Sequence, residues 1–491
     1  MLFPTTEFAL FYAVVLLLWW TIPARWRLAR KLLLLAASLF FYAWWSCRFA
    51  LLLVAVALVN HAFALAIDRA EEARRRRLVR LAVVADVALL ALFKYAGFLV
   101  VDALHPLLLA LCRAIGPGAV QAFAAFQTDH AFPLVAQIVL PIGISFYTFQ
   151  AIAYVVDVAR GAGRPARSAL DFVNCLAFFP KLCAGPIARP GELLPQMEEP
   201  PAADARIDSG RALWLVLAGL FKKTVLANYL AERLVNPFFD HADALGAADA
   251  LLAGWGYAVQ LYLDFSAYTD MAVGLALLLG FTLPVNFDAP YFSRTLQEFW
   301  RRWHISLSSW LRDYLYIPLG GSRRGAARTY LNLFLTMLLG GLWHGAGWMF
   351  LLWGGLHGAY LAAERFALRR LPAVSAAPVR FLQRVWIFHV VACLWLFFRL
   401  GTGGLGLQGA GEVFGAFART SVPACLFTWT AVAVLATGFL CQLADAHRPR
   451  ALWNRFNRLP AAVQGIVAAA LLVAILGLGP TGVPAFIYFQ F

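Results

Sequence analysis

Long apolar segments separated by short basic segments recur along the whole chain. A membrane hydrocarbon core about 30 Å thick requires about 20 mostly apolar residues per helix, and many of these segments approach that length. Lysine and arginine gather between the apolar segments in seven clusters. The clusters are residues 25–31, 69–80, 160–167, 181–223, 294–328, 365–384 and 448–458. This alternation predicts an all-α polytopic membrane protein.

The basic clusters also predict how the chain is threaded. If all of them lie in the cytoplasm, the apolar segments between them must leave and return in pairs, as the positive-inside rule requires. The pairs are residues 32–46 with 49–67, 81–100 with 132–156, 212–230 with 251–280, and 385–400 with 423–443, followed by a last helix at 461–479. We expect roughly eleven to thirteen transmembrane helices, with further re-entrant and interfacial segments.

Two segments fit poorly as ordinary spans. Residues 174–196 are interrupted by Pro180, Pro186 and Pro190, so they are expected to be re-entrant or interfacial. Non-helical backbone at membrane depth is tolerated only where protein buries it or a water-filled cavity adjoins it.

The second segment, residues 329–364, begins and ends beside basic clusters, so the chain must go out and return within it. Its rising arm, residues 330–343, has fourteen residues and would reach only about 21 Å as a helix. We therefore expect the turn at "HGAG" to lie inside the membrane, with His344 at the floor of a cavity open to the outside.

Composition supports one integral-membrane domain over residues 1–491, with its richest motifs in about 132–365. Hydrophobic residues make up 62% of the 491 residues and charged residues 14%, against about 25% charged in soluble domains. The net charge of +15 is explained by positive-inside bias rather than by nucleic acid. The first apolar run, residues 8–22, is followed by "ARWRLARK" and lacks a preceding basic stretch, so we expect it to stay as a helix rather than act as a signal peptide.

His344 is the first candidate for chemistry, because an ionisable residue in an apolar span is a functional hypothesis by default. Desolvation favours a neutral imidazole, which suits a general base. Trp343 supplies a rigid apolar wall beside it. His357 follows thirteen residues later, but no HExxH motif or CxxC pair occurs, so no metal site is expected.

The segment 293–325 has the pattern of an amphipathic helix on the cytoplasmic surface, with Phe299, Trp303, Trp310, Tyr314 and Ile317 on one stripe. Its arginines, including Arg301 and Arg302, either anchor this helix or bind phosphates of an incoming donor. His304 and Ser308 lie one turn apart in the same segment. Asp264, in the span 251–280, either lines a cavity or belongs to a structural polar network.

Several long motifs together resemble the membrane-bound O-acyltransferase family, in particular its bacterial branch for alginate O-acetylation. They include "LPIGISFYTFQAIAYVVDVARG", "FFPKLCAGPIARP", "LDFSAYTDMAVGLALLLGF", "PVNFDAPYFSRTLQEFWRRWHISLSSWLRDYLYIPLGG", "LTMLLGGLWHGAGWMFLLWGGLHG" and the final "FIYFQF". The resemblance implies a core thinned by funnels or a tunnel, in which a cytoplasmic donor meets an acceptor from the other side. It implies that His344, in "WHG", is the essential catalytic residue, and that His304 occupies the family's second motif position.

The resemblance also implies a reaction. A thioester such as acetyl-CoA would be the donor substrate, with no bound cofactor, and the product would be an acetyl ester on an exopolysaccharide, most simply alginate. Trp303, Arg301, Arg302, Trp343, Ser308 and Asp264 are candidate substrate or donor contacts. Expected partners are the lipid bilayer of the bacterial inner membrane, periplasmic acetyl-transfer proteins and a polysaccharide. The alternatives are O-acylation of cellulose or peptidoglycan, D-alanyl transfer to teichoic acid, and a transporter without chemistry.

Overall fold

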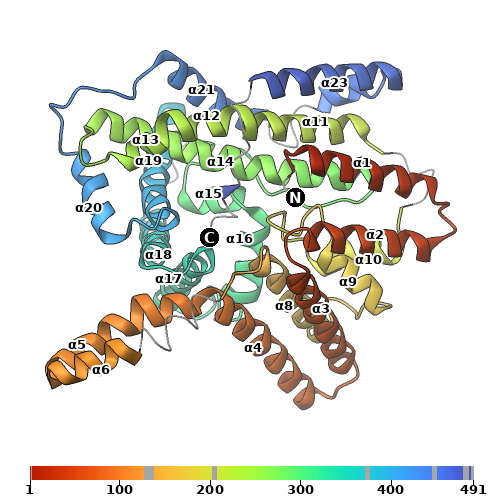
Figure 1. Ribbon diagram of the computed structural model, residues 1–491, viewed down its shortest axis with the longest axis horizontal. Coiled ribbons are helices and arrows are strands. Elements are labelled where there is room, and N and C mark those ends of the chain that lie inside the picture. The colour runs from red at the N-terminus through yellow and green to blue at the C-terminus, as the bar shows by residue number, and fades with distance from the viewer. Residues whose placement is uncertain are drawn as a thin grey trace.

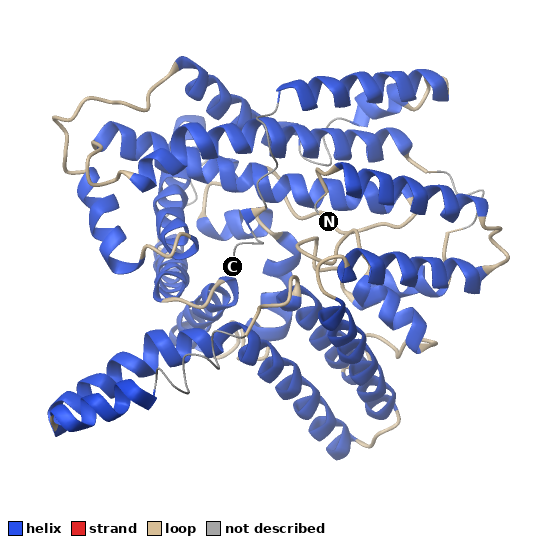
Figure 2. Ribbon diagram, in the orientation of Figure 1, coloured by secondary structure: helices blue, strands red, loops and turns tan. Residues whose placement is uncertain are grey.

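The computed structural model describes residues 1, 3–126, 138–201, 207–370, 376–444, 450–478 and 486–487. Regular structure in these ranges is helical throughout, without a β-strand (Figure 2). The elements are α1 (Thr6–Thr21), α2 (Arg27–Ala43), α3 (Cys47–Asp68), α4 (Glu72–Gly97), η1 (Phe98–Leu104), α5 (His105–Ile115), α6 (Pro117–Phe126), α8 (Ile144–Ala159), α9 (Ala169–Ala177), α10 (Pro190–Glu198), α11 (Ser209–Leu220), η3 (Phe221–Ala227), α12 (Asn228–Leu230), η4 (Ala231–Val235), α13 (Asn236–Asp240), α14 (Ala247–Leu278), η5 (Pro290–Phe292), α15 (Leu296–Arg302), α16 (Ile305–Leu311), η6 (Arg312–Tyr316), α17 (Gly325–His344), α18 (Trp348–Leu368), α19 (Ala377–Thr402), α20 (Gly406–Ala416), α21 (Trp429–Leu440), η7 (Cys441–Ala444), α22 (Arg450–Phe456) and α23 (Ala461–Leu478).

Within the described ranges, five continuous helical stretches are long and apolar enough to cross a membrane. They are Cys47–Asp68, Glu72–Ile115, Ser209–Asp240, Ala247–Leu278 and Ala377–Thr402. Shorter apolar helices accompany them at Thr6–Thr21, Ile144–Ala159, Trp429–Ala444 and Ala462–Leu478. The prediction of an all-α polytopic membrane protein is confirmed, and the count of eleven to thirteen spans stays a prediction.

The helix α14 forms the centre of the bundle, with α11 beside its C-terminal half (Figure 1). Gly219 of α11 and Gly274 of α14 allow this close approach. A Cβ at Gly219 would lie 2.6 Å from the Met271 side chain, and one at Gly274 would lie 2.7 Å from the Ala212 carbonyl oxygen. Small residues serve in this way wherever helix backbones pack closely.

The helices α17 and α18 form the hairpin expected around His344, and residues 345–347 make its turn. The predicted start of the rising arm is wrong, because α17 begins at Gly325 and not at 330. Its first five residues, "GAART", are not strongly apolar, but alanine and arginine favour helix. The helix therefore begins before the apolar run does. The twenty residues of α17 would reach about 30 Å, so arm length alone does not place the turn within the membrane.

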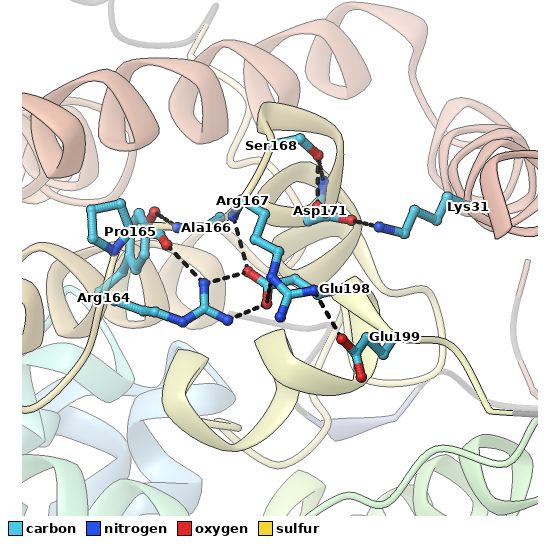
Figure 3. A network of polar contacts seen from close by, with 10 residues as sticks. Lys31, Arg164, Pro165, Ala166, Arg167, Ser168, Asp171, Glu198 and Glu199 are labelled. Carbon is cyan, nitrogen blue, oxygen red and sulfur yellow. Dashed lines mark hydrogen bonds and ion pairs between the residues drawn. The ribbon is translucent and has the colours of Figure 1, made fainter.

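A polar network joins three of the basic clusters, as expected if they share one side of the membrane (Figure 3). Lys31 pairs with the buried Asp171 at 2.5 Å, and Arg164 donates to the buried Glu198 at 3.0 Å. The Arg167 amide also donates to Glu198, at 2.9 Å. Burial alone would raise the pKa of Glu198, but the hydrogen bonds from Arg164 and Arg167 outweigh burial and lower it. The network fixes α9 and α10 against α2.

The irregular segment between α9 and α10 is buried in protein, which agrees with the expectation for residues 174–196. Residues 178–188 are all buried, and Pro180 and Pro186 lie outside the helices. The Lys181 amino group donates to the Gln150 side chain and, at 3.3 Å, to the Leu176 carbonyl. These bonds satisfy a cation that would otherwise be costly to bury.

The predicted single amphipathic surface helix over 293–325 is wrong. The chain forms two short helices, α15 and α16, which are separated at Trp303 and His304. His304 adopts a left-handed backbone conformation, φ 44° and ψ 56°, which ends any continuous helix. Trp303 and His304 are fully buried, while Ile317 is 44% exposed, so the expected stripe does not face one surface. Periodicity alone could not reveal a break that long-range contacts stabilise.

Candidate functional site

His344 is the last residue of α17, and aromatic rings surround its side chain. Its relative exposure is 3%. The ring meets Trp343, Trp353 and Phe398 edge-on, with centroid distances of 4.9, 5.1 and 5.3 Å. Burial among apolar rings disfavours a charged imidazole, so the neutral form expected of a general base is the one this environment favours.

His304 lies at the break between α15 and α16, where Asn286 fixes both its backbone and its ring. The Ile305 amide donates to the Asn286 carbonyl oxygen at 3.0 Å, and the Ser306 amide donates to the Asn286 Oδ1 at 3.1 Å. The same Oδ1 lies 3.2 Å from the His304 Nδ1. A left-handed non-glycine residue costs on the order of 1–3 kcal/mol and persists only where its surroundings impose it.

The Asn286 contact determines the His304 tautomer. The Ser306 amide can only donate, so the Asn286 atom that it reaches is the acceptor oxygen. The His304 Nδ1 must therefore carry the proton in this contact. In a neutral ring, this leaves Nε2 as the unprotonated nitrogen, which accepts a hydrogen bond. Donation from Nε2 to an oxyanion would require the charged ring that burial disfavours.

Trp343 connects the two histidines. Its ring centroid lies 6.2 Å from that of His304 and 4.9 Å from that of His344. Phe149 stacks on Trp343 at 5.3 Å. His304 and His344 are also close enough to interact electrostatically. The structure thus brings together three of the residues selected from the sequence, through one shared aromatic side chain.

The other predicted contacts have roles within the fold. Trp303 is fully buried against Phe299 and Trp395, and Ser308 donates to the Trp303 carbonyl at 3.1 Å. Both side chains therefore contribute to packing around the histidine.

The paired arginines differ from each other. Arg302 pairs with Glu298 at 2.8 Å, whereas the Arg301 side chain is exposed. Of the two, Arg301 presents the more accessible guanidinium for a phosphate.

Asp264 belongs to a polar network. Its carboxylate pairs with Lys223 at 2.5 Å and accepts from the Ile487 amide at 2.7 Å. Its chain neighbour Phe265 meets the His304 ring at 4.7 Å. Asp264 therefore fixes the segment at 486–487 and helps to position the helix α14 beside His304.

A polar cavity of about 340 Å³ adjoins this network, between the stretch Ser209–Asp240, α14 and α19. Lys223, Asp264 and Gln260 line its buried part, and the exposed Glu232 and Asp240 line its outer part. Its volume lies in the range of ligand pockets, about 300–1,000 Å³. The chain neighbours of two lining residues reach the histidines: Phe265, next to Asp264, meets the His304 ring, and Phe398, next to Arg399, meets the His344 ring.

Sequence reasoning missed Asn286 and Lys94, which contact the two histidine segments from distant parts of the chain. Lys94 carried a usable signal, because it is a lone cation in an apolar run.

His357 is fully buried, with its Nδ1 3.0 Å from the Trp353 carbonyl oxygen. Among the described residues, no three His, Cys, Asp or Glu side chains form a group that could hold a metal ion.

The helical membrane bundle agrees with what comparison of the sequence finds. Residues 164–402 match the MBOAT, membrane-bound O-acyltransferase family. In one relative the similarity extends over 94% of the chain. The chain belongs to this family and is an O-acyltransferase.

Individual relatives show which described proteins of the family this chain resembles. The chain is 44% identical to a "probable alginate O-acetylase" of Azotobacter vinelandii, over 79% of this chain and 73% of the relative. It is 37% identical to a protein of the same description from Pseudomonas putida, over 94% of both chains. It is also 35% identical to a peptidoglycan O-acetyltransferase of Helicobacter pylori, over 75% of this chain and 71% of the relative.

Proposed function

We propose that this O-acyltransferase moves an acetyl group from cytoplasmic acetyl-CoA across the bacterial inner membrane, for O-acetylation of an exopolysaccharide, alginate. The observation that carries the proposal is the contact of both His344 and His304 with the Trp343 ring. Similarity to proteins described as alginate O-acetylases supports the acceptor. The polysaccharide would receive its acetyl groups through periplasmic transfer proteins.

The proposed chemistry is a single acyl transfer. His344 removes the proton of an acceptor hydroxyl, and the hydroxyl oxygen attacks the thioester carbonyl carbon. The carbon–sulfur bond breaks, and the leaving thiolate takes the proton from His344. A positioned general base contributes about 10²–10⁴-fold to such a step. The hydroxyl has a single proton, which His344 takes. The His304 Nε2, as the hydrogen-bond acceptor that its tautomer provides, would therefore position the acyl donor by accepting from one of the donor's N–H groups.

Two polar regions of the protein would serve different substrates. The exposed Arg301 lies in a basic segment expected in the cytoplasm, where it can bind donor phosphates. The polar cavity lies beside the ends of α13 and α19, which the proposed topology places outside. Its mixed donors and acceptors suit the hydroxyl-rich acceptor side.

The second candidate function is a related transfer with a different acyl group or glycan. Similarity to a peptidoglycan O-acetyltransferase favours another glycan. Similarity to a teichoic acid D-alanyltransferase of Streptococcus thermophilus, 27% identical over 48% of this chain and 59% of the relative, favours D-alanyl as the transferred group. Both alternatives retain the same histidine chemistry.

Donor use separates these candidates. Inverted membrane vesicles from producing cells expose the cytoplasmic face, and they would be supplied with labelled acetyl-CoA or with acetyl and D-alanyl thioesters of carrier proteins. The proposal expects acetyl-CoA alone to label an ester-linked product inside the vesicles, in a reaction that vesicles containing His344→Ala lack. Labelling only from a carrier-bound thioester would contradict acetyl-CoA as the donor. Equal labelling by the His344→Ala vesicles would contradict the chemistry.

A further inference from the structure

Lys94 is an isolated cation in the apolar stretch Glu72–Ile115. No other lysine or arginine occurs between Arg80 and Arg113. A lysine at such a position is costly, and its amino group is expected to have specific partners within the protein. Its partners are therefore informative about why it is there.

The Lys94 amino group binds the end of the helix that carries His344. It donates to the carbonyl oxygens of Trp343 and His344, the latter at 3.3 Å, and lies 3.4 Å from the Ser145 hydroxyl. The adjacent Tyr95 hydroxyl donates to the Leu342 carbonyl at 2.8 Å. Three consecutive carbonyls of the last turn of α17 are thus bound by two neighbouring residues of α4.

These contacts occur where the helix cannot satisfy its own backbone. The last four carbonyls of any α-helix lack partners within it. After His344 the chain becomes extended, with φ −163° and ψ 151° at Gly345, so no further helical turn follows. A cationic donor is also favoured at a helix C-terminus. The amino group additionally lies 5.6 Å from the centre of the Trp343 ring, which packs against both histidines.

We propose that Lys94 is a positioning residue of the acyl-transfer site, which fixes the last turn of α17 and thereby the ring of His344 beside Trp343. The inference rests on the proposed role of His344. Without the amino group, the carbonyls of Trp343 and His344 lose their bonds to α4, and the helix end is free to move relative to the substrates. Misplacement of a reacting group by about 1 Å can reduce a rate by about 10²-fold.

The test compares three variants of the full chain in inverted membrane vesicles. Lys94→Met keeps the length of the side chain and removes its donors, whereas Lys94→Arg restores donors. Tyr95→Phe is the matched control, because it removes one hydrogen bond from the same turn of α4 but leaves the Trp343 and His344 carbonyls bound. For each variant, kcat and the KM for acetyl-CoA are measured per mole of enzyme, together with thermal unfolding in detergent.

We expect Lys94→Met to lower kcat about 10- to 100-fold with the KM for acetyl-CoA unchanged. Lys94→Arg should recover most of this loss, and Tyr95→Phe should stay within about threefold of the parent chain. If Lys94→Met unfolds, Lys94→Gln takes its place, because its side chain is one atom shorter and neutral and should not maintain the bonds to both carbonyls, so the same loss of kcat is expected. A parental kcat in folded Lys94→Met, or in Lys94→Gln where it is used instead, would overturn the inference, as would a Tyr95→Phe loss as large as that of the Lys94 variant. Activity that survives His344→Ala would instead refute the proposed function, whatever the Lys94 variants do.

Discussion

Gly358 allows α17 and α18 to pack backbone against backbone, and its replacement by alanine tests whether this contact maintains the site. A Cβ at Gly358 would lie 2.7 Å from the Phe334 Cα and 2.9 Å from the Phe334 carbonyl oxygen. An ordinary contact begins near 3.4 Å, so the two helices would have to separate by about 0.7 Å. Neither atom belongs to a flexible side chain that could move aside.

The expected cost of Gly358→Ala follows from this overlap. Overpacking of a close contact destabilises a protein by about 1–3 kcal/mol, which exceeds the roughly 0.5–1 kcal/mol that alanine gains over glycine in a helix. Activity should fall as well, because Trp353 of α18 meets the His344 ring at 5.1 Å.

Gly355 provides a matched control on the same helix and against the same neighbour. A Cβ there would lie 3.7 Å from the Leu338 side chain, which is an ordinary contact. Thermal unfolding in detergent and the rate of acetyl transfer would be measured for both variants. We expect Gly358→Ala to lower both and Gly355→Ala to leave both unchanged or raise stability. The reasoning fails if the two variants behave alike.

Three further substitutions test polar networks described above, two of them near His304 and the third between α9 and α10. Asn286→Leu leaves the His304 Nδ1 and the Ser306 amide without their acceptor. The free energy of unfolding should fall by about 1–3 kcal/mol, and the rate of acetyl transfer should fall with it. Parental activity would exclude a role for Asn286 in fixing His304. Lys223→Met leaves the buried Asp264 carboxylate without its ion pair and should cost about 3–5 kcal/mol in thermal unfolding, a loss that Lys223→Met with Asp264→Asn should partly reverse. Glu198→Gln should lower stability at pH 7. Because the pKa of Glu198 is lowered in the folded protein, ionised Glu198 contributes stability above its unfolded pKa, near 4.3, and this contribution is lost as the pH falls through the lower folded pKa. The stability difference from the parent chain should therefore shrink as the pH falls below about 4.3 and disappear below the folded pKa, and a difference independent of pH would contradict this reasoning.

The sequence was most informative where local composition decides structure. Apolar length predicted the helical membrane class. The basic clusters predicted which segments share one side of the membrane, and the contacts of Lys31 and Arg164 agree with that prediction. Prolines marked the buried irregular segment before α10. His344 could be singled out because an imidazole is conspicuous among apolar residues, and its burial among aromatic rings agrees with that selection.

The remaining features depend on residues far apart in the chain. The break at His304 is stabilised by Asn286, eighteen residues earlier, and no periodicity within 293–325 encodes that contact. The contact between Lys94 and the His344 carbonyl spans 250 residues. Lys94 could have been selected by the argument that selected His344, but its partner could not. The start of α17 at Gly325 was missed because hydrophobicity marks where a helix meets lipid and not where it begins.

The most direct test of the central claim compares His344→Asn with His357→Asn in cells that produce the exopolysaccharide. Both histidines are buried and both contact Trp353, but only His344 is placed at the reaction. Acetyl ester content of the polymer would be measured at matched amounts of membrane-inserted protein. We expect no detectable acetylation with His344→Asn and substantial acetylation with His357→Asn. Parental acetylation by the His344→Asn variant would contradict the account.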